Sequence, residues 1–531
     1  MKLFKLMPLF IAVIVISSCE SELTDLENIG TQTAAVYFND PENALAGLSS
    51  CYASIQDDEY FVFGDIMSDD AIKGGSNFFD WVDREYIRTF TANSGNGTSG
   101  GTWSLMYRTI VRCNEVINAL PSATFDEDLK LRIIAEAKFI RAYAYSKLVP
   151  LFGGVPLVTK DFTVDNLTAP RSSVTEIYAF IKEDLNDAIA NLPEKSEYAV
   201  ADLGRVTKGA ARLLKVRVLM QETAYVNNPV LAASAAHTVD LIANWNEVYT
   251  LTNAIIGSGE YALASNFATI FEEAGENNIE SIFEIQHKQT NNEWGESVGN
   301  TTIVQMGNRD DWGWCFNAPT DALYNTFLST DPRLLNTIYG QEFDVLYGVA
   351  QTWQKQLWTL DDDSTKEFVT KTRLNRKYAL AKEDRASNHN NQDVNKRVMR
   401  YAEVLLARAE AAHFKGFEGE ARNFVNQVRT RAQNSTMPLG SALGQTSGYT
   451  YDNFSGASVP PVTSTGDALL LDIWKERRME LAMEGIRYFD IIRTGRIDLL
   501  PNESNYASHD GLLPLPIGDV NTFGLPQNKG Y

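Results

Sequence analysis

The sequence predicts a mainly α fold in which paired helices form a scaffold and long irregular segments make up a second, loop-rich part. Apolar residues recur at helical spacing through several long runs. Many runs carry alanine-rich faces that let neighbouring helices approach closely, as in tetratricopeptide-type helix pairs. No strict repeat of about 34 residues is legible, and a plain helical bundle would look similar. The 531 residues exceed the roughly 250–300 over which one core usually grows, so a second domain or an elongated architecture is expected.

The first residues are typical of a lipoprotein signal peptide. Lys2 and Lys5 precede an apolar run over residues 6–16, and two serines follow just before Cys19. This layout indicates a cleaved secretory signal, because a membrane span would need about 20 apolar residues. Small residues before a cysteine resemble a lipobox, so we expect Cys19 to be lipidated and to become the new N-terminus. The alternative is an ordinary signal peptide with an incidental cysteine.

This interpretation divides the chain. Residues 1–18 form the signal peptide, residues 19–33 a lipidated polar tether, and residues 34–531 the body of the protein. Within the body we expect an N-terminal helical part over about 34–250, followed by a loop-rich and C-terminal helical part over about 251–531. The mature protein is then a soluble body tethered by acyl chains outside the cytoplasm. Functions that need ATP, nucleotide cofactors or cytosolic partners are disfavoured there.

Helices are predicted along both parts of the body. Residues 173–176 form a capping box, which marks the start of a helix. Pro150 and the two glycines after it are expected to end the helix before them. The predicted helical ranges are 129–149, 177–192, 204–225, 232–245, 398–415 and 419–432.

Three long segments between these helices do not look helical. They cover residues 57–101, 253–397 and 437–464, and the second contains a short strand-like run at 281–285. Loops of this length in an ordered protein are usually functional or disordered. Six of the nine tryptophans lie in them, and disordered segments rarely carry that much aromatic surface. The six are Trp81, Trp294, Trp312, Trp314, Trp353 and Trp358.

Charge and cysteine usage exclude several classes of function. The formal charge of −21 becomes −23 once the two signal lysines are removed, which argues against nucleic-acid binding. Apart from Cys19, three cysteines remain without C-x-x-C spacing, so neither a disulfide framework nor a zinc site is predicted. Cys51 and Cys113 are expected to be small core residues. The five histidines show no metal-binding spacing, and no metal or cofactor is predicted.

Three glutamates near the C-terminus invite a catalytic interpretation. Glu476, Glu480 and Glu484 fall at i, i+4 and i+8 on one predicted helical stripe. Such like charges need neutralising, and three arginines lie within reach in the sequence. These are Arg477, Arg478 and Arg487. Because nearby cations keep carboxylates ionised, a structural network is favoured over the carboxylate pair of a glycoside hydrolase.

Two further patterns are interpreted as accidental. Residues 97–101 match G-x-S-x-G but lie in a glycine-rich loop without the preceding strand that a serine hydrolase needs. The acidic run at residues 361–363 lacks the alternating spacing of a calcium-binding loop, so a solvated acidic turn is preferred.

Several long stretches resemble one protein family. They are RAYAYSKLVPLFGGVPLV at residues 141–158, RYAEVLLARAEAA at 400–412, VNQVRTRA at 425–432, WKERRMELAMEGIRYFDIIR at 474–493, and the tail 512–531. In this order, and with the lipobox, they closely resemble the SusD/RagB family of nutrient-binding outer-membrane lipoproteins of Bacteroidetes.

The resemblance implies a fold and a role. The fold would be tetratricopeptide-like helix pairs with a loop-rich half that carries the ligand surface. The protein would bind glycans without being an enzyme and pass them to a SusC-like, TonB-dependent transporter. It would be lipid-anchored in the outer membrane and face the cell exterior, and Glu20 and Glu22 resemble the family's export signal.

Glycan recognition needs flat aromatic faces framed by hydrogen-bonding side chains. Two loops offer that mixture, and a third tryptophan lies among polar residues. The candidate glycan-binding residues are Asn77, Asp80, Trp81, Trp294, Arg309, Asp310 and Trp312. Trp103 is expected to lie in the core. For Trp314 a structural role is expected at least as much as a ligand-binding one, so neither residue is included among the candidates. The family's ligand loops lie at about these places, but their residues vary with the glycan, so the assignment is regional.

Two alternatives stay open at this point. A surface lipoprotein glycosidase would release sugar. A helical-repeat scaffold that binds only protein would bury its loop tryptophans. The sequence does not specify which glycan, or whether a peptide, is bound.

Overall fold

The structure, a computed structural model, describes most of the body of the chain. The described residues are 34–76, 78–160, 170–289, 299–307, 313–339, 345–346, 349–350, 358–359, 365–366, 373–380, 384–438, 451–452 and 456–531. The predicted signal peptide, Cys19 and the tether therefore lie outside them. None of the described helices is both long enough and apolar enough to cross a membrane.

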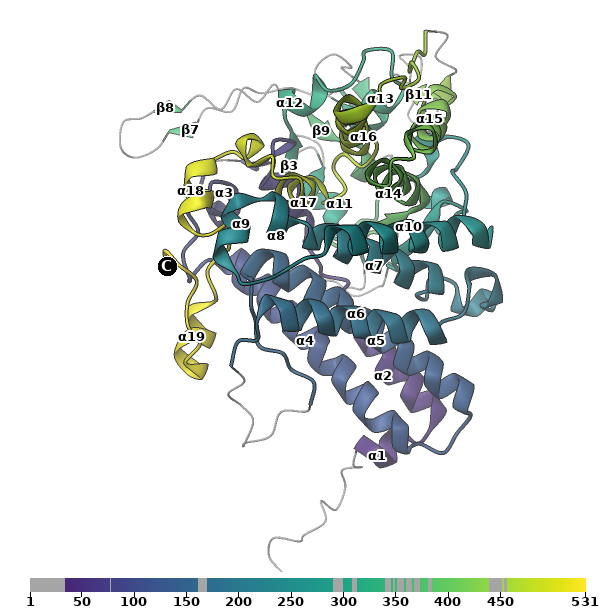
Figure 1. The fold of residues 1–531 in the computed structure, drawn as a ribbon, viewed down its shortest axis with the longest axis vertical. Coiled ribbons are helices and arrows are strands. Elements are labelled where there is room, and N and C mark those ends of the chain that lie inside the picture. The colour runs from purple at the N-terminus through teal and green to yellow at the C-terminus, as the bar shows by residue number, and fades with distance from the viewer. Residues whose placement is uncertain are drawn as a thin grey trace, which may run out of the picture.

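Long helices packed in sequence order form most of the fold (Figure 1). Each of α4, α5, α6, α7, α10 and α14 packs against the next, and α14 also packs against α15 and α16. This confirms the predicted mainly α architecture of paired helices. The long helices are α2 (Pro41–Ala53), α4 (Gly97–Ala119), α5 (Glu127–Phe152), α6 (Val174–Asn191), α7 (Lys208–Glu222), α10 (Leu241–Ser258), α14 (Tyr401–Phe414), α15 (Glu418–Gln433) and α16 (Gly466–Glu480).

Short helices connect and cover the long ones. The α-helical pieces are α1 (Ala34–Tyr37), α3 (Val82–Arg88), α8 (Ala224–Asn227), α9 (Pro229–Ser234), α11 (Thr302–Met306), α12 (Asp321–Tyr324), α13 (Arg333–Thr337), α17 (Arg487–Arg493), α18 (Glu503–Ser508) and α19 (Ile517–Phe523). A π-helical turn, η1 (Val62–Ile66), precedes β1. The 3₁₀ turns are η2 (Leu120–Ser122), η3 (Lys195–Glu197), η4 (Val200–Asp202), η5 (Phe267–Thr269), η6 (Glu273–Gly275), η7 (Arg376–Tyr378) and η10 (Ile497–Leu499).

The strands are short and pair two by two, always antiparallel. The pairs are β1 (Ala71–Gly74) with β3 (Phe316–Pro319), β2 (Ser281–Ile285) with β10 (Lys396–Arg400), β4 (Ile338–Tyr339) with β9 (Leu374–Asn375), β5 (Val345–Leu346) with β6 (Val349–Ala350), β7 (Trp358–Thr359) with β8 (Thr365–Lys366), and β11 (Met437–Pro438) with β12 (Tyr451–Asp452). The strand predicted at residues 281–285 is confirmed as β2.

Local sequence explains where the helices begin. Ser173 and Glu176 form the predicted capping box at the start of α6, where the Glu176 N–H donates to the Ser173 hydroxyl and the Ser173 N–H donates to the Glu176 carboxylate. Asp126 caps α5 in a similar way by accepting from the Leu129 N–H. Helix α5 continues through Pro150 to Phe152 and ends where Gly153 takes a φ of 72°, which glycine adopts readily.

Three predicted boundaries were wrong. The helix expected over 232–245 is interrupted, because α9 ends at Ser234 and Asp240 caps the start of α10. The helix expected from residue 398 begins at Tyr401, because the residues before it pair with β2 as strand β10. The segment 57–101, expected to be non-helical, contains η1, α3 and the start of α4.

The first and last parts of the chain are joined by partly buried polar contacts. The Asp65 carboxylate accepts from the Gly485 N–H at 2.9 Å. The Arg487 guanidinium donates to Asp69 at 2.7 Å, and Arg478 donates to Asp70 at 2.7 Å. These contacts hold the segment around η1 and β1 against the turn that follows α16.

Candidate functional site

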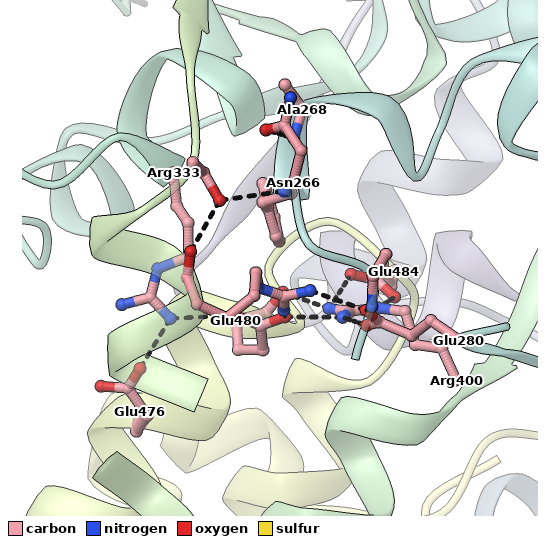
Figure 2. A network of polar contacts seen from close by, with 12 residues as sticks. Asn266, Ala268, Glu280, Arg333, Arg400, Glu476, Glu480 and Glu484 are labelled. Atoms are coloured by element: carbon pink, nitrogen blue, oxygen red, sulfur yellow. Dashed lines mark hydrogen bonds and ion pairs between the residues drawn. The ribbon is translucent and has the colours of Figure 1, made fainter. Parts of the chain in front are cut away.

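The glutamates near the C-terminus form a buried structural network (Figure 2). The Glu480 carboxylate has 0 % exposure and accepts from Arg333 at 3.0 Å, from Arg400 at 2.6 Å and from Arg431. Glu280, which precedes β2, accepts from Arg400 and Arg431 as well. The three guanidinium groups hold the pKa of Glu480 far below its ordinary value. The predicted structural role is therefore confirmed.

The predicted partners and the predicted stripe were wrong. Arg477 pairs with Asp490, whereas Arg478 and Arg487 pair with aspartates near β1. Adjacent helix positions point in different directions, so an arginine next to a glutamate in sequence does not face it. Helix α16 ends at Glu480, so Glu484 lies in the following turn, where it accepts from Arg400.

A solvent-open cleft of about 660 Å³ lies beside the start of α3 and the first turns of α4. Aromatic, acidic, hydroxyl and basic side chains share its wall. It is lined by Asp57, Glu59, Phe79, Trp81, Val82, Asp83, Gly97, Thr98, Gly101, Thr102, Leu105 and Arg108. This mixture can bind the faces of sugar rings and their hydroxyl groups.

Trp81 presents one face of its ring to the cleft. Its side chain packs over the Arg84 guanidinium at 4.3 Å and against the Phe316 ring at 5.9 Å, yet 47 % of the residue is exposed. Trp81 caps α3 with a φ of 54°, a left-handed conformation that is rare for a bulky residue. Such strain persists where surrounding contacts enforce it and often marks functional sites.

A buried arginine supports the tryptophan from below. Arg84 has 0 % exposure and also lies over the Phe61 and Phe316 rings. Its guanidinium donates to Glu59 at 2.7 Å and to Gln305 at 2.8 Å. Burial lowers the pKa of Arg84, and the Glu59 carboxylate opposes that change. Arg84 thus anchors the aromatic wall of the cleft.

Asp80 closes the loop that carries Trp81. Its carboxylate accepts from the Ser76 N–H and from the Ser76 hydroxyl, both at 2.8 Å. The Lys73 ammonium donates to the Asp80 carbonyl at 2.5 Å. These contacts fix the turn between β1 and α3, so Asp80 positions the neighbouring aromatic residues.

Helix α4 forms the opposite wall. Asn96 caps the helix through its contact with the Ser99 N–H, and the Gly97 N–H donates to Asp83 at 2.7 Å. A Cβ atom added at Gly101 would meet nothing within 4 Å, so this position is open toward the cleft. The G-x-S-x-G residues therefore form the first helical turn and not the predicted loop, and Ser99 is buried.

Several polar side chains of the cleft have no internal partner. Among the residues that the structure describes, no hydrogen bond or ion pair engages the side chains of Asp57, Thr98, Thr102 or Arg108. By contrast, Glu59 and Asp83 are held by Arg84 and by the Gly97 N–H. The free groups can exchange their water contacts for contacts to a ligand.

The structure describes only part of the predicted site. Trp81 and Asp80 lie at the cleft or next to it. Asn77, Trp294, Arg309, Asp310 and Trp312 lie outside the described residues. Pairing of β1 with β3 places Gly74, which precedes the first predicted loop in the sequence, opposite Phe316, which follows the second. Trp103 is buried as predicted, and Trp314 is half-buried.

Sequence reasoning missed the contribution of α4. Gly101, Leu105 and Arg108 recur at helical spacing and share one face, which was the available signal. Phe79, 61 % exposed, was visible beside Trp81 but was not selected. Cys51 and Cys113 are core residues as predicted, and within the described ranges no group of three or more His, Cys, Asp or Glu residues could hold a metal ion.

Comparisons with known proteins agree with this architecture. The sequence model of the SusD family matches residues 279–511, and a second model, described as "starch-binding associating with outer membrane", matches residues 38–219. A SusD-like protein of Formosa agariphila is 24% identical over 522 residues, covering 95% of this chain and 94% of its own.

Solved structures share the fold. A laminarin-binding SusD-like protein superposes with a TM-score of 0.74 at 24% identity, over 92% of this chain and 99% of its own. Surface glycan-binding protein A of Bacteroides thetaiotaomicron, solved with laminarihexaose, superposes with a TM-score of 0.68 at 24% identity, with the same coverage.

Proposed function

The chain belongs to the SusD family, and we propose that it is an outer-membrane glycan-binding lipoprotein that captures oligosaccharides or polysaccharides and delivers them to a SusC-like, TonB-dependent transporter. In this proposal Cys19 carries the lipid anchor, the cleft faces the cell exterior and the protein performs no catalysis. The relatives that bind laminarin or laminarihexaose support a glycan as the ligand.

The open face of Trp81 is the observation that carries the proposal. A sugar ring stacks its C–H face on such a surface, while unpaired side chains around it hydrogen-bond the hydroxyls. Asp57, Thr98, Thr102 and Arg108 supply those groups in the cleft. The exposure of Trp81 also favours a ligand site over a protein-binding scaffold with buried loop tryptophans.

The charge of the cleft favours a neutral glycan. Asp57, Glu59 and Asp83 line it against the single cation Arg108. Sulfated or uronate-rich polysaccharides would meet carboxylates at short range and be disfavoured. Laminarin and starch-type glucans are therefore the first ligands to test.

Replacing Trp81 by Ala is expected to weaken glycan binding about tenfold or more, because the stacking surface is lost. The measurement is isothermal titration calorimetry of the lipid-free body, first against a panel of neutral polysaccharides and then against the oligosaccharide of the class that binds. Phe417→Ala is the matched control, since Phe417 is also 47 % exposed but lies on α14–α15 away from the cleft. Equal affinities in the wild type and in both variants would contradict the site.

Filling the cleft from Gly101 is expected to abolish binding without loss of stability. In Gly101→Leu the added side chain enters the cleft, because nothing lies within 4 Å of the Cβ position. Leucine also forms helices better than glycine, by somewhat less than the roughly 0.8–1 kcal/mol that separates alanine from glycine. Gly257→Leu on α10 is the control, since it has the same open surroundings away from the cleft. Thermal unfolding and calorimetry are measured on both, and unchanged binding by Gly101→Leu would place the ligand elsewhere.

The remaining predicted residues are part of the same proposal. Asn77, Arg309, Asp310 and Trp312 follow or precede segments that β1 and β3 hold together, and Trp294 is a further candidate. A glycosidase is not favoured, because Glu59 and Asp83 are already committed to Arg84 and to the Gly97 N–H. Sugar release from any glycan that binds would contradict this.

A further inference from the structure

A second, smaller cavity lies inside the helical scaffold, away from the cleft. It has a volume of about 90 Å³ and is enclosed by residues of α5, α6, α7, α14, α16 and α17. Lys147, Gln221 and Phe489 line it and are only half-buried, so water reaches its lining. Because one water occupies about 30 Å³ in the liquid, the space suits a ligand of a few heavy atoms.

The lining of this cavity is cationic in a strongly acidic protein. Four cationic side chains, those of Lys147, Arg217, Arg477 and Arg493, face two carboxylates, those of Glu403 and Asp490. Both carboxylates are already bound internally. Arg217 donates twice to Glu403, and Asp490 accepts from both Arg477 and Arg493. Neither carboxylate of the lining therefore needs a bound cation to neutralise its charge.

Three donors in the lining lack an acceptor. The Tyr178 hydroxyl and the Arg477 Nη1 are buried and have no hydrogen-bond partner among the described residues. Tyr178 is 2 % exposed and Arg477 is 3 % exposed. The Lys147 ammonium lies 3.6 Å from the Tyr60 ring and 4.7 Å from the Tyr143 ring, and the structure gives it no hydrogen bond to a described residue. Buried donors without partners are costly, so Tyr178 and Arg477 each call for an acceptor, and the half-buried Lys147 ammonium can donate to the same group.

The rest of the lining is apolar. Leu214, Val218 and Met220 all come from α7, and Phe489 stacks on Tyr60 with 4.9 Å between ring centroids. If an inorganic oxyanion filled the cavity, these apolar side chains would contact its polar oxygen atoms, which is unfavourable. A carboxylate on a short hydrocarbon chain fits both the polar and the apolar part of the lining. Its oxygens can accept from the three donors, and its carbon atoms can contact the apolar side chains.

From these observations we propose that the cavity binds a small organic carboxylate, held by Lys147, Arg477 and Tyr178. The site is separate from the glycan cleft and does not depend on what the cleft binds. A free short-chain acid fits it, whereas a polymer does not, because the volume admits only a few heavy atoms.

The protonation of Lys147 accords with an anion ligand. Burial lowers the pKa of Lys147 to about 7, Asp58 and Glu403 oppose that change, and Arg217 adds to it. A bound carboxylate would raise this pKa again, so binding takes up protons near neutral pH. The other charged or titratable groups that line the cavity are Tyr60, Tyr143, Tyr178, Arg477, Asp490 and Arg493.

The test compares butyrate with its neutral amide, butyramide, and with inorganic phosphate. Calorimetry on the full body at about neutral pH is expected to show butyrate binding at millimolar concentrations, with at least about tenfold weaker binding of butyramide and phosphate. Lys147→Met is expected to weaken butyrate at least about tenfold and Tyr178→Phe several-fold. Lys160→Met, at an exposed lysine away from the cavity, is the control and should bind as the wild type does.

Several outcomes would overturn the proposal. They are the absence of butyrate binding, equal affinity for butyrate and butyramide, equal or tighter binding of phosphate, and full affinity in Lys147→Met. Thermal unfolding of each variant without ligand confirms that a lost signal reflects the site and not a misfolded protein. Tyr178→Phe removes only a buried hydroxyl without a partner, so it provides a second variant that folds.

Discussion

Replacing Glu480 by Gln is expected to lower the free energy of unfolding by about 3–5 kcal/mol. The carboxylate is fully buried and accepts from Arg333, Arg400 and Arg431 (Figure 2). Without its charge the three guanidinium groups remain buried and under-compensated, and the amide adds donors where only acceptors are needed. Because the pKa of Glu480 is depressed, its stabilising effect is complete above the unfolded-state pKa of about 4.3 and is lost as the pH falls from there through the folded-state pKa.

Denaturant unfolding of Glu480→Gln measures this loss, with an unchanged m-value expected if the fold is preserved. Glu127→Gln is the matched control, because the Glu127 side chain is 69% exposed and forms a single pair with Lys130. Its stability should stay within about 0.5 kcal/mol of the wild type. A loss below about 1 kcal/mol in Glu480→Gln would contradict a central role of this carboxylate.

Replacing Lys147 by Met is expected to stabilise the protein at neutral pH and below, by roughly 2–4 kcal/mol. The ammonium of the half-buried Lys147 lies over aromatic rings without a hydrogen bond to a described residue, and Met keeps the volume of the side chain without the charge. Because Lys147 is partly exposed, we expect a stabilisation smaller than the full free energy that corresponds to its pKa change.

The effect should depend on pH with a defined sign. Burial lowers the folded-state pKa of Lys147 to about 7, against about 10.4 in the unfolded chain. Below pH 7 both states carry the charge and the full penalty applies. Between these two values the unfolded state binds more protons, so the stability of the wild type rises with pH relative to Lys147→Met. Thermal unfolding of both proteins at about pH 6 and about pH 9.5 checks this, and a constant difference would count against it.

The fold could be predicted where local patterns decide it. The capping box at Ser173 and Glu176 marked α6 because both partners lie within one helical turn. The role of Glu480 could be predicted from charge alone, but its partner Arg333 lies 147 residues away and no local signal indicates it. The boundary at Tyr401 was missed because the strand before it is defined by pairing with β2.

The candidate site was predictable to a similar extent. Trp81 could be found because its segment combines aromatic residues with acidic and amide side chains, the mixture that glycan recognition needs. Gly101 and Arg108 were missed because a glycine-rich segment looks like a loop, whereas Asn96 caps it into a helix. The internal carboxylate site escaped notice because its donors come from α5, α6 and α16, and only folding brings them together.

The contacts of Asp65, Asp69 and Asp70 with the C-terminal part of the chain have a consequence for biogenesis. They join residues 408 to 420 positions apart, so they form only when nearly the whole polypeptide has been synthesised. Closing so long a loop slows folding far more than it weakens the native state. Until Arg478, Gly485 and Arg487 have been added, the three aspartates lack these hydrogen-bond partners. A polypeptide that ends before these residues would therefore lack the contacts that hold the segment around η1 and β1 against the C-terminal part of the fold.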